Sequence, residues 1–313
     1  GLRVMQDQVR VLEDVVYVFF CYKQSSYLDK TLPAALEQTA WPSQLLVLDD
    51  CSPDDSHEKI LSLLEFAPKG LNIEYRHNKQ NIGLVSQINS LRGQYQNKLI
   101  IVQAGDDIAM PNRIEETYET WLKNGKPSLI IGSYDKISEQ GDVIEPFESI
   151  KQNKKPYTLE NIINRKCAVD GCCAAFTSDV LNEFEPYNID IINEDRINVL
   201  RAFLLNGIHH EHKKWIQYRL GGISTFAKET REEKYNNTVI NAQRELQDLK
   251  MNLRDAQSKN ANEAVSAIKK RMRSAEFMAS LPQSNFALYS EAICYLVKTL
   301  DYRTVLKVLR RLK

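Results

Sequence analysis

Short apolar runs alternate with amphipathic stretches along the first half of the chain. Runs rich in β-branched and aromatic residues, typical of buried strands, occupy residues 15–22, 44–50, 71–78, 98–105 and 127–135. Stretches with apolar residues at helical spacing occupy residues 25–39, 54–67, 82–93 and 111–125. This alternation predicts an α/β fold with a parallel, doubly wound sheet, in which ligands bind at the carboxyl ends of the strands.

The second half of the chain is less regular. Helices are predicted at 159–165 and 193–207, a strand with a short helix at 170–184, and a strand leading into a glycine turn at 213–224. From about Lys228 the composition becomes polar and helical. We therefore predict an N-terminal tail (1–14), a catalytic domain (15–225) and a helical C-terminal extension (226–313).

Composition narrows the class of protein. With 313 residues, 43% of them hydrophobic, the chain can bury a large core. The 41 basic and 41 acidic residues balance, so nucleic acid is not an expected partner. The longest apolar run, Val15 to Tyr22, is too short to span a bilayer. Six cysteines without a CxxC pair favour reduced thiols and a cytoplasmic protein over a zinc finger or a disulfide framework.

Adjacent acidic residues occur at three places where such a sheet would carry a site. The pairs are Asp49–Asp50, Asp106–Asp107 and Glu194–Asp195. Each pair alone is compatible with helix capping or with the positive end of a helix. Two carboxylates side by side repel each other, and a divalent cation would relieve that repulsion. All three pairs at the ends of successive elements favour a site.

Glycine-rich phosphate loops are missing from the sequence. No G-x-G-x-x-G follows the first strand, where FFCYKQSSY stands, and no G-x-x-x-x-G-K-[ST] occurs. A dinucleotide-binding dehydrogenase and a P-loop NTPase are therefore not expected. A nucleotide site built on carboxylates and a cation remains.

The order of the motifs resembles family 2 glycosyltransferases, which have the GT-A nucleotide-sugar fold. The resemblance covers roughly residues 15–225, and it lies in the opening strand with LLVLDDCSPDD, in HNKQNIGLVSQINSL, in QAGDDIAMPNRI, in NEDRINVLRAFLLNG and in YRLGGIS. It implies a mainly parallel twisted sheet flanked by helices. No single motif is decisive, but their order and spacing together are specific.

The resemblance also implies roles for individual residues. Asp106 would hold Mg²⁺ or Mn²⁺ on the diphosphate, with Asp107 in the same cluster. Asp195 would be the catalytic base, supported by Glu194. The remaining nucleotide-binding positions implied by the family pattern are Phe20, Cys21, Tyr22, Asp49, Asp50, Asn81, Gly83, Asn89 and Arg219.

Three positions depart from the family pattern. The family often has an acidic residue where Ala104 stands, so metal binding would rest on fewer carboxylates. Its Pro-Thr after the first strand is Phe20-Cys21 here, and its usual Asn is Lys23. The pocket for the base would differ accordingly, although uracil is expected.

The expected function is inverting transfer of a sugar from a nucleotide-diphosphate sugar to an acceptor hydroxyl. A UDP-sugar is the expected donor and a saccharide or lipid-linked saccharide the expected acceptor, in surface polysaccharide or O-antigen synthesis. The alternatives are a nucleotidyltransferase, which would release pyrophosphate, and a catalytically silent nucleotide-sugar-binding module. The sequence predicts no oligomeric state.

Two further patterns leave alternatives open. The basic amphipathic tail, with Arg303, Lys307, Arg310, Arg311 and Lys313, predicts either peripheral contact with the inner face of a membrane or packing against the catalytic domain or a partner subunit. His209, His210 and His212 are interpreted as part of a solvated loop rather than as metal ligands.

Overall fold

The computed structural model describes residues 8–150, 155–221 and 229–312, and these fall into two compact units. The first unit is formed by Gly1–Lys154, Ala168–Pro186 and Arg201–Ile223. The second is formed by Lys155–Cys167, Tyr187–Leu200 and Ser224–Lys313. The predicted domain boundary between residues 225 and 226 lies outside the described residues.

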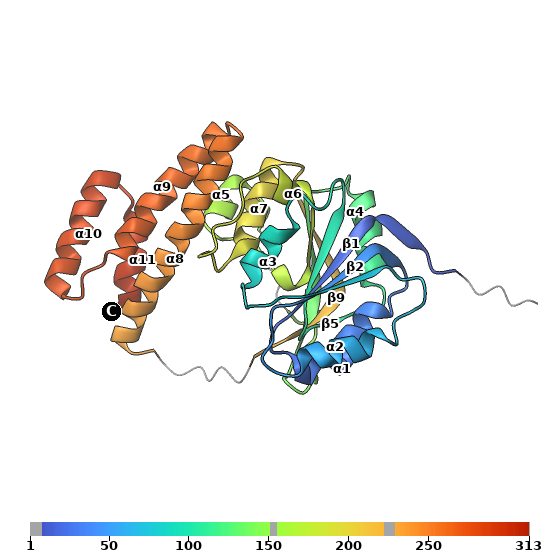
Figure 1. Ribbon diagram of the computed structural model, residues 1–313. Coiled ribbons are helices and arrows are strands. Elements are labelled where there is room, and N and C mark those ends of the chain that lie inside the picture. Colours follow the sequence, from blue (N-terminus) through green and yellow to red (C-terminus); the bar gives the residue numbers. More distant parts are fainter. Residues whose placement is uncertain (1–7, 151–154, 222–228, 313) are drawn as a thin grey trace, which may run out of the picture. The chain divides into compact units, whose positions relative to one another are not determined.

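The first unit is built on a nine-stranded sheet with the order β3-β2-β1-β4-β8-β6-β9-β5, and β7 pairs with β6. Figure 1 labels β1, β2, β5 and β9 of this sheet. The strands are β1 (Val11–Cys21), β2 (Trp41–Asp49), β3 (Ile73–His77), β4 (Leu99–Ala104), β5 (Ile108–Ala109), β6 (Leu129–Ile137), β7 (Val143–Glu145), β8 (Ala174–Thr177) and β9 (Ile208–Arg219). β1 begins inside the stretch predicted as a tail, because Val11 and Leu12 pair with Trp41 and Pro42 of β2.

The sheet is mixed, with a second parallel pair, β6 and β9, outside its first half. β1 to β4 pair in parallel, as the sequence pattern predicted. β8, which follows the short 3₁₀ helix η1 (Gly171–Cys173), lies between β4 and β6 and is antiparallel to both. The prediction of a mainly parallel sheet flanked by helices is confirmed, and the pattern did not reveal that β8 is antiparallel to its neighbours. A buried apolar run has the same pattern whichever way the strand points, so the pattern carried no information on direction.

Helices of the first unit cover the sheet. They are α1 (Ser25–Leu36), α2 (Ser56–Leu64), α3 (Leu84–Leu91), α4 (Arg113–Lys123) and α6 (Asp179–Asn182). Alternate residues of a strand point to opposite faces. Tyr17 and Phe19 of β1 accordingly share one buried cluster with Leu32 of α1, Ile60 of α2 and Trp121 of α4. Three helices therefore pack on one face of the sheet and hold the carboxyl ends of its parallel strands in place.

The histidine cluster lies on a strand and not in a loop. β9 begins at Ile208, so His209, His210 and His212 belong to it and pair alongside β6. The loop interpretation is wrong because the strand extends five residues before Lys213, the predicted start. His209 pairs with Glu211 at 2.8 Å, and burial lowers the pKa of His210.

The second unit is helical. Its elements are α5 (Leu159–Ile163), the first turns of α7 (Glu194–Leu204), α8 (Arg231–Ser258), α9 (Asn262–Ala279), α10 (Asn285–Thr299) and α11 (Tyr302–Leu312). α8 opens with a capping box, in which Thr230 and Glu233 satisfy each other's backbone N–H groups. Among the described residues, no helix has the length and apolar character needed to cross a bilayer.

The basic tail forms α11, and its apolar face is buried. Val305, Val308 and Leu312 belong to the core of the second unit, together with Phe277 of α9 and Leu288 of α10. The apolar face of α11 therefore packs within the helical extension itself, a partner that the sequence alternatives of membrane, catalytic domain or partner subunit did not include. The basic side chains on the other face of α11 are exposed: Arg303, Lys307, Arg310 and Arg311. Lys313 lies outside the described residues.

Candidate active site

The acidic turn after β4 is fixed against the end of β1. The N–H of Gly105 donates to the carbonyl of Phe20 at 2.7 Å, and Thr31 of α1 donates to the carbonyl of Gly105 at 2.7 Å. A Cβ at Gly105 would lie 2.5 Å from Oε1 of Gln24 and 3.0 Å from the Phe20 carbonyl oxygen. A larger residue would therefore have to displace the Gln24 side chain and shift the backbone at Phe20. The turn therefore presents Asp106 and Asp107 at the edge where β1 ends.

Asp107 carries an uncompensated buried oxygen. Its side chain is 1% exposed, Oδ1 accepts from the N–H of Arg219 at 3.0 Å, and Oδ2 has no hydrogen-bond partner among the described residues. Burial, and then the neighbouring Asp106, raise the pKa of Asp107 to about 7. Burial also raises the pKa of Asp106. The pair is thus short of positive charge.

Arg219 is hydrogen-bonded to both aspartates of the acidic turn. Its Nε donates to the carbonyl of Asp106 at 2.8 Å, and Nη1 donates to the carbonyls of Ser138 and Glu139 at 3.0 and 2.6 Å. The guanidinium carbon lies 4.3 Å from the centre of the Tyr27 ring. These contacts make Arg219 a positioning residue for the acidic turn. Its contact with a diphosphate stays a prediction.

Two carboxylates fit a divalent cation that substrate would help to hold. The described residues contain no group of three or more His, Cys, Asp or Glu side chains arranged as a metal site. Mg²⁺ binds through one or two carboxylates together with substrate phosphates and water, and does not need a protein cage. The unpaired oxygen of Asp107 and the carboxylate of Asp106 supply this donor set. The chemistry of the donors fits Mg²⁺ or Mn²⁺ held by these two residues.

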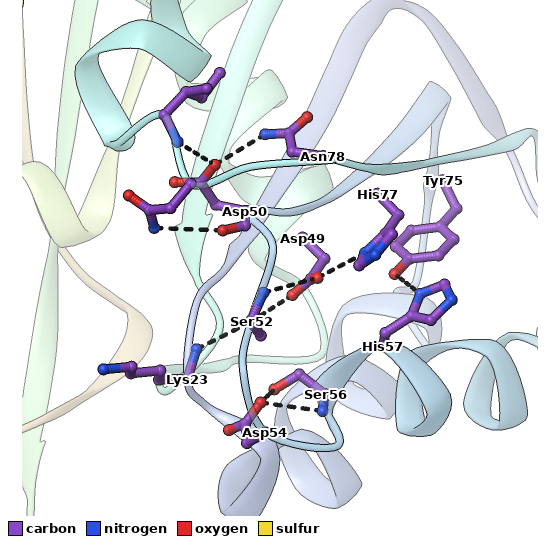
Figure 2. Close-up of polar contacts among 12 residues, drawn as sticks. Lys23, Asp49, Asp50, Ser52, Asp54, Ser56, His57, Tyr75, His77 and Asn78 are labelled. Carbon is purple, nitrogen blue, oxygen red and sulfur yellow. Dashed lines mark hydrogen bonds and ion pairs between the residues drawn. The ribbon is translucent and has the colours of Figure 1, made fainter.

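The carboxylates of Asp49 and Asp50, at the end of β2, accept hydrogen bonds from other residues of the chain (Figure 2). Asp49 is fully buried, accepts from the N–H of Ser52, and lies 2.9 Å from Nδ1 of His77. Asp50 accepts from Nδ2 of Asn78 at 2.9 Å and from the N–H groups of Ile82 and Gly83 at 2.9 and 2.8 Å.

These bonds make Asp50 the organiser of residues 78–83. Asn81 adds a bond from its side chain to the Asp50 carbonyl at 3.3 Å, and Gly83 has a φ of +81° where α3 begins. Asn89, also predicted to bind nucleotide, lies half-buried on α3. Direct contact of Asp49 or Asp50 with a nucleotide stays a prediction, while their part in shaping this segment is observed.

The register of the parallel strands brings the first-unit residues together. Cys21 pairs with Asp49, and Phe20 pairs with Ala104, so three strand ends meet at one edge of the sheet. Phe20 and Cys21 are buried, and burial raises the pKa of Cys21 to about 12. Tyr22 is exposed, with Nζ of Lys23 above its ring at 5.4 Å from the centre. The aromatic Tyr22 is thus available at the rim of this edge.

Glu194 and Asp195 lie in the first turn of α7 and belong to the second unit. Negative charge is favoured at the amino end of a helix. Oδ1 of Asp195 accepts from the N–H of Arg196 at 2.9 Å. Burial, assisted by Asp195 and Asp248, raises the pKa of Glu194 to about 7. The two neighbours therefore differ: Asp195 accepts a backbone hydrogen bond, whereas Glu194 is a weaker acid than an ordinary glutamate.

A buried polar network within the second unit supports this segment. Asp248 of α8 accepts from Nη2 of Arg165 at 2.6 Å and from the side chain of Asn193, next to Glu194. Glu245, one turn earlier, accepts from Arg271 of α9 and lies 3.9 Å from Nε of Arg165. The helical extension thus contributes side chains to the neighbourhood of the candidate base.

Sequence reasoning missed this network. Its signal was present as acidic and amide residues at helical spacing on one stripe of α8, now seen buried: Glu245, Asp248, Asn252 and Asp255. Polar residues in a charged helix are ordinarily solvated, so only the partners revealed the stripe.

The mixed α/β sheet with acidic turns at its parallel strand ends defines the GT-A class of nucleotide-sugar transferase folds, and solved structures share the fold. TarS 1-349 of S. aureus superposes with a TM-score of 0.54 at 14% identity, covering 94% of this chain and 82% of that one. The mannosyltransferase PcManGT of Pyrobaculum calidifontis, in complex with GDP-Man and Mn²⁺, gives 0.50 at 12% identity, covering 96% and 86%. At such identities the likeness shows the fold.

The chain belongs to glycosyl transferase family 2, because residues 17–184, more than half of it, match the model of that family. An uncharacterized glycosyltransferase of Rickettsia felis is 27% identical over 175 residues, which are 53% of this chain and 27% of that protein. One of Haemophilus influenzae is 28% identical over 124 residues, 39% of this chain and 37% of that protein. The matched part thus spans about a quarter to a third of these relatives. The predicted family and fold class are confirmed.

Proposed function

We propose that this chain is an inverting glycosyltransferase that moves a sugar from a nucleoside diphosphate sugar to an acceptor hydroxyl. The observation that carries the proposal is the acidic turn 105–107, where a buried oxygen of Asp107 has no partner among the described residues beside a second carboxylate. The family supports the reaction type. The neighbour TarS has been crystallised with UDP-GlcNAc and PcManGT with GDP-Man and Mn²⁺.

In this mechanism Asp106 and Asp107 would hold Mg²⁺ or Mn²⁺ beside the place of the donor's diphosphate. The cation, when bound, offsets the charge that develops on the leaving nucleoside diphosphate. Arg219 fixes the conformation of the turn that carries both carboxylates, through its hydrogen bonds to Asp106 and Asp107. The segment 78–83, ordered by Asp50, and the exposed Tyr22 would receive the nucleoside.

Asp195 would accept the proton of the acceptor hydroxyl as that oxygen attacks the anomeric carbon. The hydroxyl is a poor nucleophile until a positioned carboxylate removes its proton. The carbon passes through an oxocarbenium-like state, and attack from the face opposite the diphosphate inverts it. The anchored carboxylate of Asp195 suits this role, with Glu194 beside it as a buried, more weakly acidic support.

We further propose a UDP-sugar donor and a saccharide or lipid-linked saccharide acceptor, in surface polysaccharide or O-antigen synthesis at the inner face of a membrane. These finer assignments rest on the family resemblance. The neighbours carry both UDP and GDP sugars, which supports a nucleotide sugar without choosing the base.

The deciding experiment incubates the full chain with a panel of UDP- and GDP-sugars and measures nucleoside diphosphate release with Mn²⁺, with Mg²⁺ and with EDTA. We expect metal-dependent release with one donor and a β-linked product from an α-linked donor. Pyrophosphate release from sugar phosphates and nucleoside triphosphates would identify a nucleotidyltransferase instead. Donor binding without turnover on any acceptor would identify a binding module.

A further inference from the structure

The helix α10 exposes an apolar stripe that its packing does not use. Its inner face, with Leu288 and Ala292, belongs to the core of the second unit. A second set of apolar residues with the spacing of one helical face is exposed: Phe286, Tyr289, Ile293, Val297 and Leu300. Phe286 is 87% exposed, Val297 72% and Leu300 80%. Single exposed apolar residues are ordinary, but an aligned set on one helix marks a contact surface.

The C-terminal cap of α10 is an exposed apolar residue in an unfavourable backbone conformation. Leu300 caps the helix with a φ of 56°, in the left-handed region where glycine is the common residue. A side chain other than glycine is strained there. The chain nevertheless has a leucine that the fold leaves exposed. This residue extends the apolar stripe to the turn before α11.

Basic side chains follow the stripe along the chain, on α11. After Asp301, which comes next to Leu300, Tyr302 and Arg303 begin α11, and both are exposed. A groove of ≈ 690 Å³ between α8 and α11 is lined by Lys234, Arg303, Leu306, Lys307, Arg310 and Arg311. Five of these six side chains are cationic and none is acidic. The acidic groups nearby include Glu229, which pairs with Arg311 at 3.5 Å, Asp301, which accepts from Tyr295, and Glu160, whose charge acts on Arg303.

Over residues 286–312 the chain has five basic side chains and two acidic ones, Glu291 and Asp301. A surface that is apolar along one helix and basic along the next matches an anionic bilayer, whose headgroups attract cations while its acyl region accepts apolar side chains. A second copy docked isologously through the same stripe would bring two such basic faces together, with repulsion between them. Charge therefore favours the lipid surface as the occupant.

We propose that the exposed stripe of α10 and the basic face of α11 form a docking surface for an anionic membrane. The apolar side chains enter the boundary between headgroups and acyl chains, and the α11 cations contact lipid phosphates. This assignment differs from the one drawn from sequence, because the apolar face of α11 is buried and α10 supplies the inserting residues. The docking surface lies wholly in the second unit and does not depend on the proposed transfer reaction.

The test is flotation of the full chain with vesicles of phosphatidylcholine alone or with about 30 mol% phosphatidylglycerol. We expect binding to the anionic vesicles at least about tenfold stronger than to the neutral ones, and weakened at high salt. The stripe variant Phe286→Ser/Ile293→Ser/Val297→Ser should lower the partition coefficient by at least about tenfold. The charge variant Arg303→Gln/Lys307→Gln/Arg310→Gln should lower it about a hundredfold, from roughly tenfold or less per cation.

Matched controls come from the first unit. Phe66 is 85% exposed, so Phe66→Ser removes an equally exposed phenylalanine. Lys30→Gln/Lys69→Gln/Lys123→Gln removes three exposed cations. Both controls should float like the native chain, and circular dichroism should show unchanged helix content in all variants.

Three results would overturn the proposal. The first is no flotation of the native chain with anionic vesicles. The second is flotation that the stripe and charge variants leave unchanged. The third is concentration-dependent self-association, seen by sedimentation and abolished by the stripe variant, without vesicle binding; this would assign the face to a second copy.

Discussion

The backbone N–H of Arg219 donates to Oδ1 of Asp107 at 3.0 Å, while the side chain of the same arginine donates to the carbonyl of Asp106 at 2.8 Å. One residue at the end of β9 is thus hydrogen-bonded to both members of the acidic pair. The pair was recognisable in the sequence, but these hydrogen bonds depend on the pairing of β9 beside β6 and β5, which brings a distant residue against the turn.

Replacing Arg219 with lysine should weaken metal binding while leaving the chain folded. The backbone bond to Asp107 remains, but the fork to the carbonyls of Asp106, Ser138 and Glu139 is lost. Loss of a residue that orients metal ligands weakens metal affinity by about tenfold to a hundredfold. Mn²⁺ affinity measured without nucleotide tests this, with Arg10→Lys on the surface as the control. Unchanged Mn²⁺ affinity together with weaker nucleotide binding would assign Arg219 to the diphosphate directly.

Asp106→Asn and Asp107→Asn should each reduce transfer by more than about a hundredfold, because losing a ligand costs more than losing its support. Both should also weaken nucleotide binding in Mn²⁺. Asp142→Asn, on an exposed turn of the same unit, is the matched control and should be silent. Turnover and isothermal titration give the two quantities. Normal turnover of the variants, or full native activity in EDTA, would contradict the metal site.

Asp195→Asn should reduce the transfer rate by about a hundredfold or more, the usual scale for a general base. Donor affinity should change little, because this residue is assigned to the acceptor. The exposed Asp190→Asn, in the segment before α7, is the control. Rate and donor affinity are measured together. Near-native transfer would move the base to Glu194, and joint loss of binding and transfer would make Asp195 structural.

Glu194 should make the protein less stable as pH rises. The pKa of its carboxyl is raised from 4.5 to about 7 in the folded state, so the folded state binds the proton more tightly than the unfolded state. Its stabilising contribution is complete below about pH 4.5 and is lost as pH rises through about 7, by on the order of 3 kcal/mol. Urea unfolding across this range should show the fall, and Glu194→Gln should reduce it to the part that comes from Asp107, whose pKa is also raised to about 7. An identical pH dependence in the variant would refute the assignment.

Asp248→Leu should lower the free energy of unfolding by about 3 kcal/mol, because it leaves the charge of Arg165 without its main partner. The single change Arg165→Met should have a similar effect. The double variant should be more stable than the sum of the two losses predicts, since it removes both charges. A cycle of urea unfolding measurements gives the coupling energy, and strict additivity would show that the pair is not coupled.

Strand and helix positions in the first half followed from the apolar pattern, because β1, β2 and β4 contain runs of consecutive buried residues and α1 to α4 each bury one face. The pattern could not predict the direction of each strand or the strands with which it pairs. β8 has the pattern of any buried strand, and its antiparallel place between β4 and β6 depends on how the chain returns.

The candidate site was predictable to the same extent. The paired aspartates could be recognised as residues, whereas their environment could not. The sequence does not reveal that the carboxylate of Asp50 accepts hydrogen bonds from residues 78–83. Nor does it reveal that Oδ2 of Asp107 is buried without a hydrogen-bond partner in the described chain. Those properties arise from contacts between segments far apart in sequence.

The second unit is assembled from three separate stretches of chain, and this limits how the protein can be dissected. Arg165 comes from the first stretch, Asn193 from the second and Asp248 from the third, yet their side chains form one network. A fragment cut after residue 225 would keep Arg165 and Asn193 and lose Asp248. Chimeras that exchange the terminal helices with those of a relative would therefore have to carry residues 155–167 and 187–200 with them, as one co-inherited set.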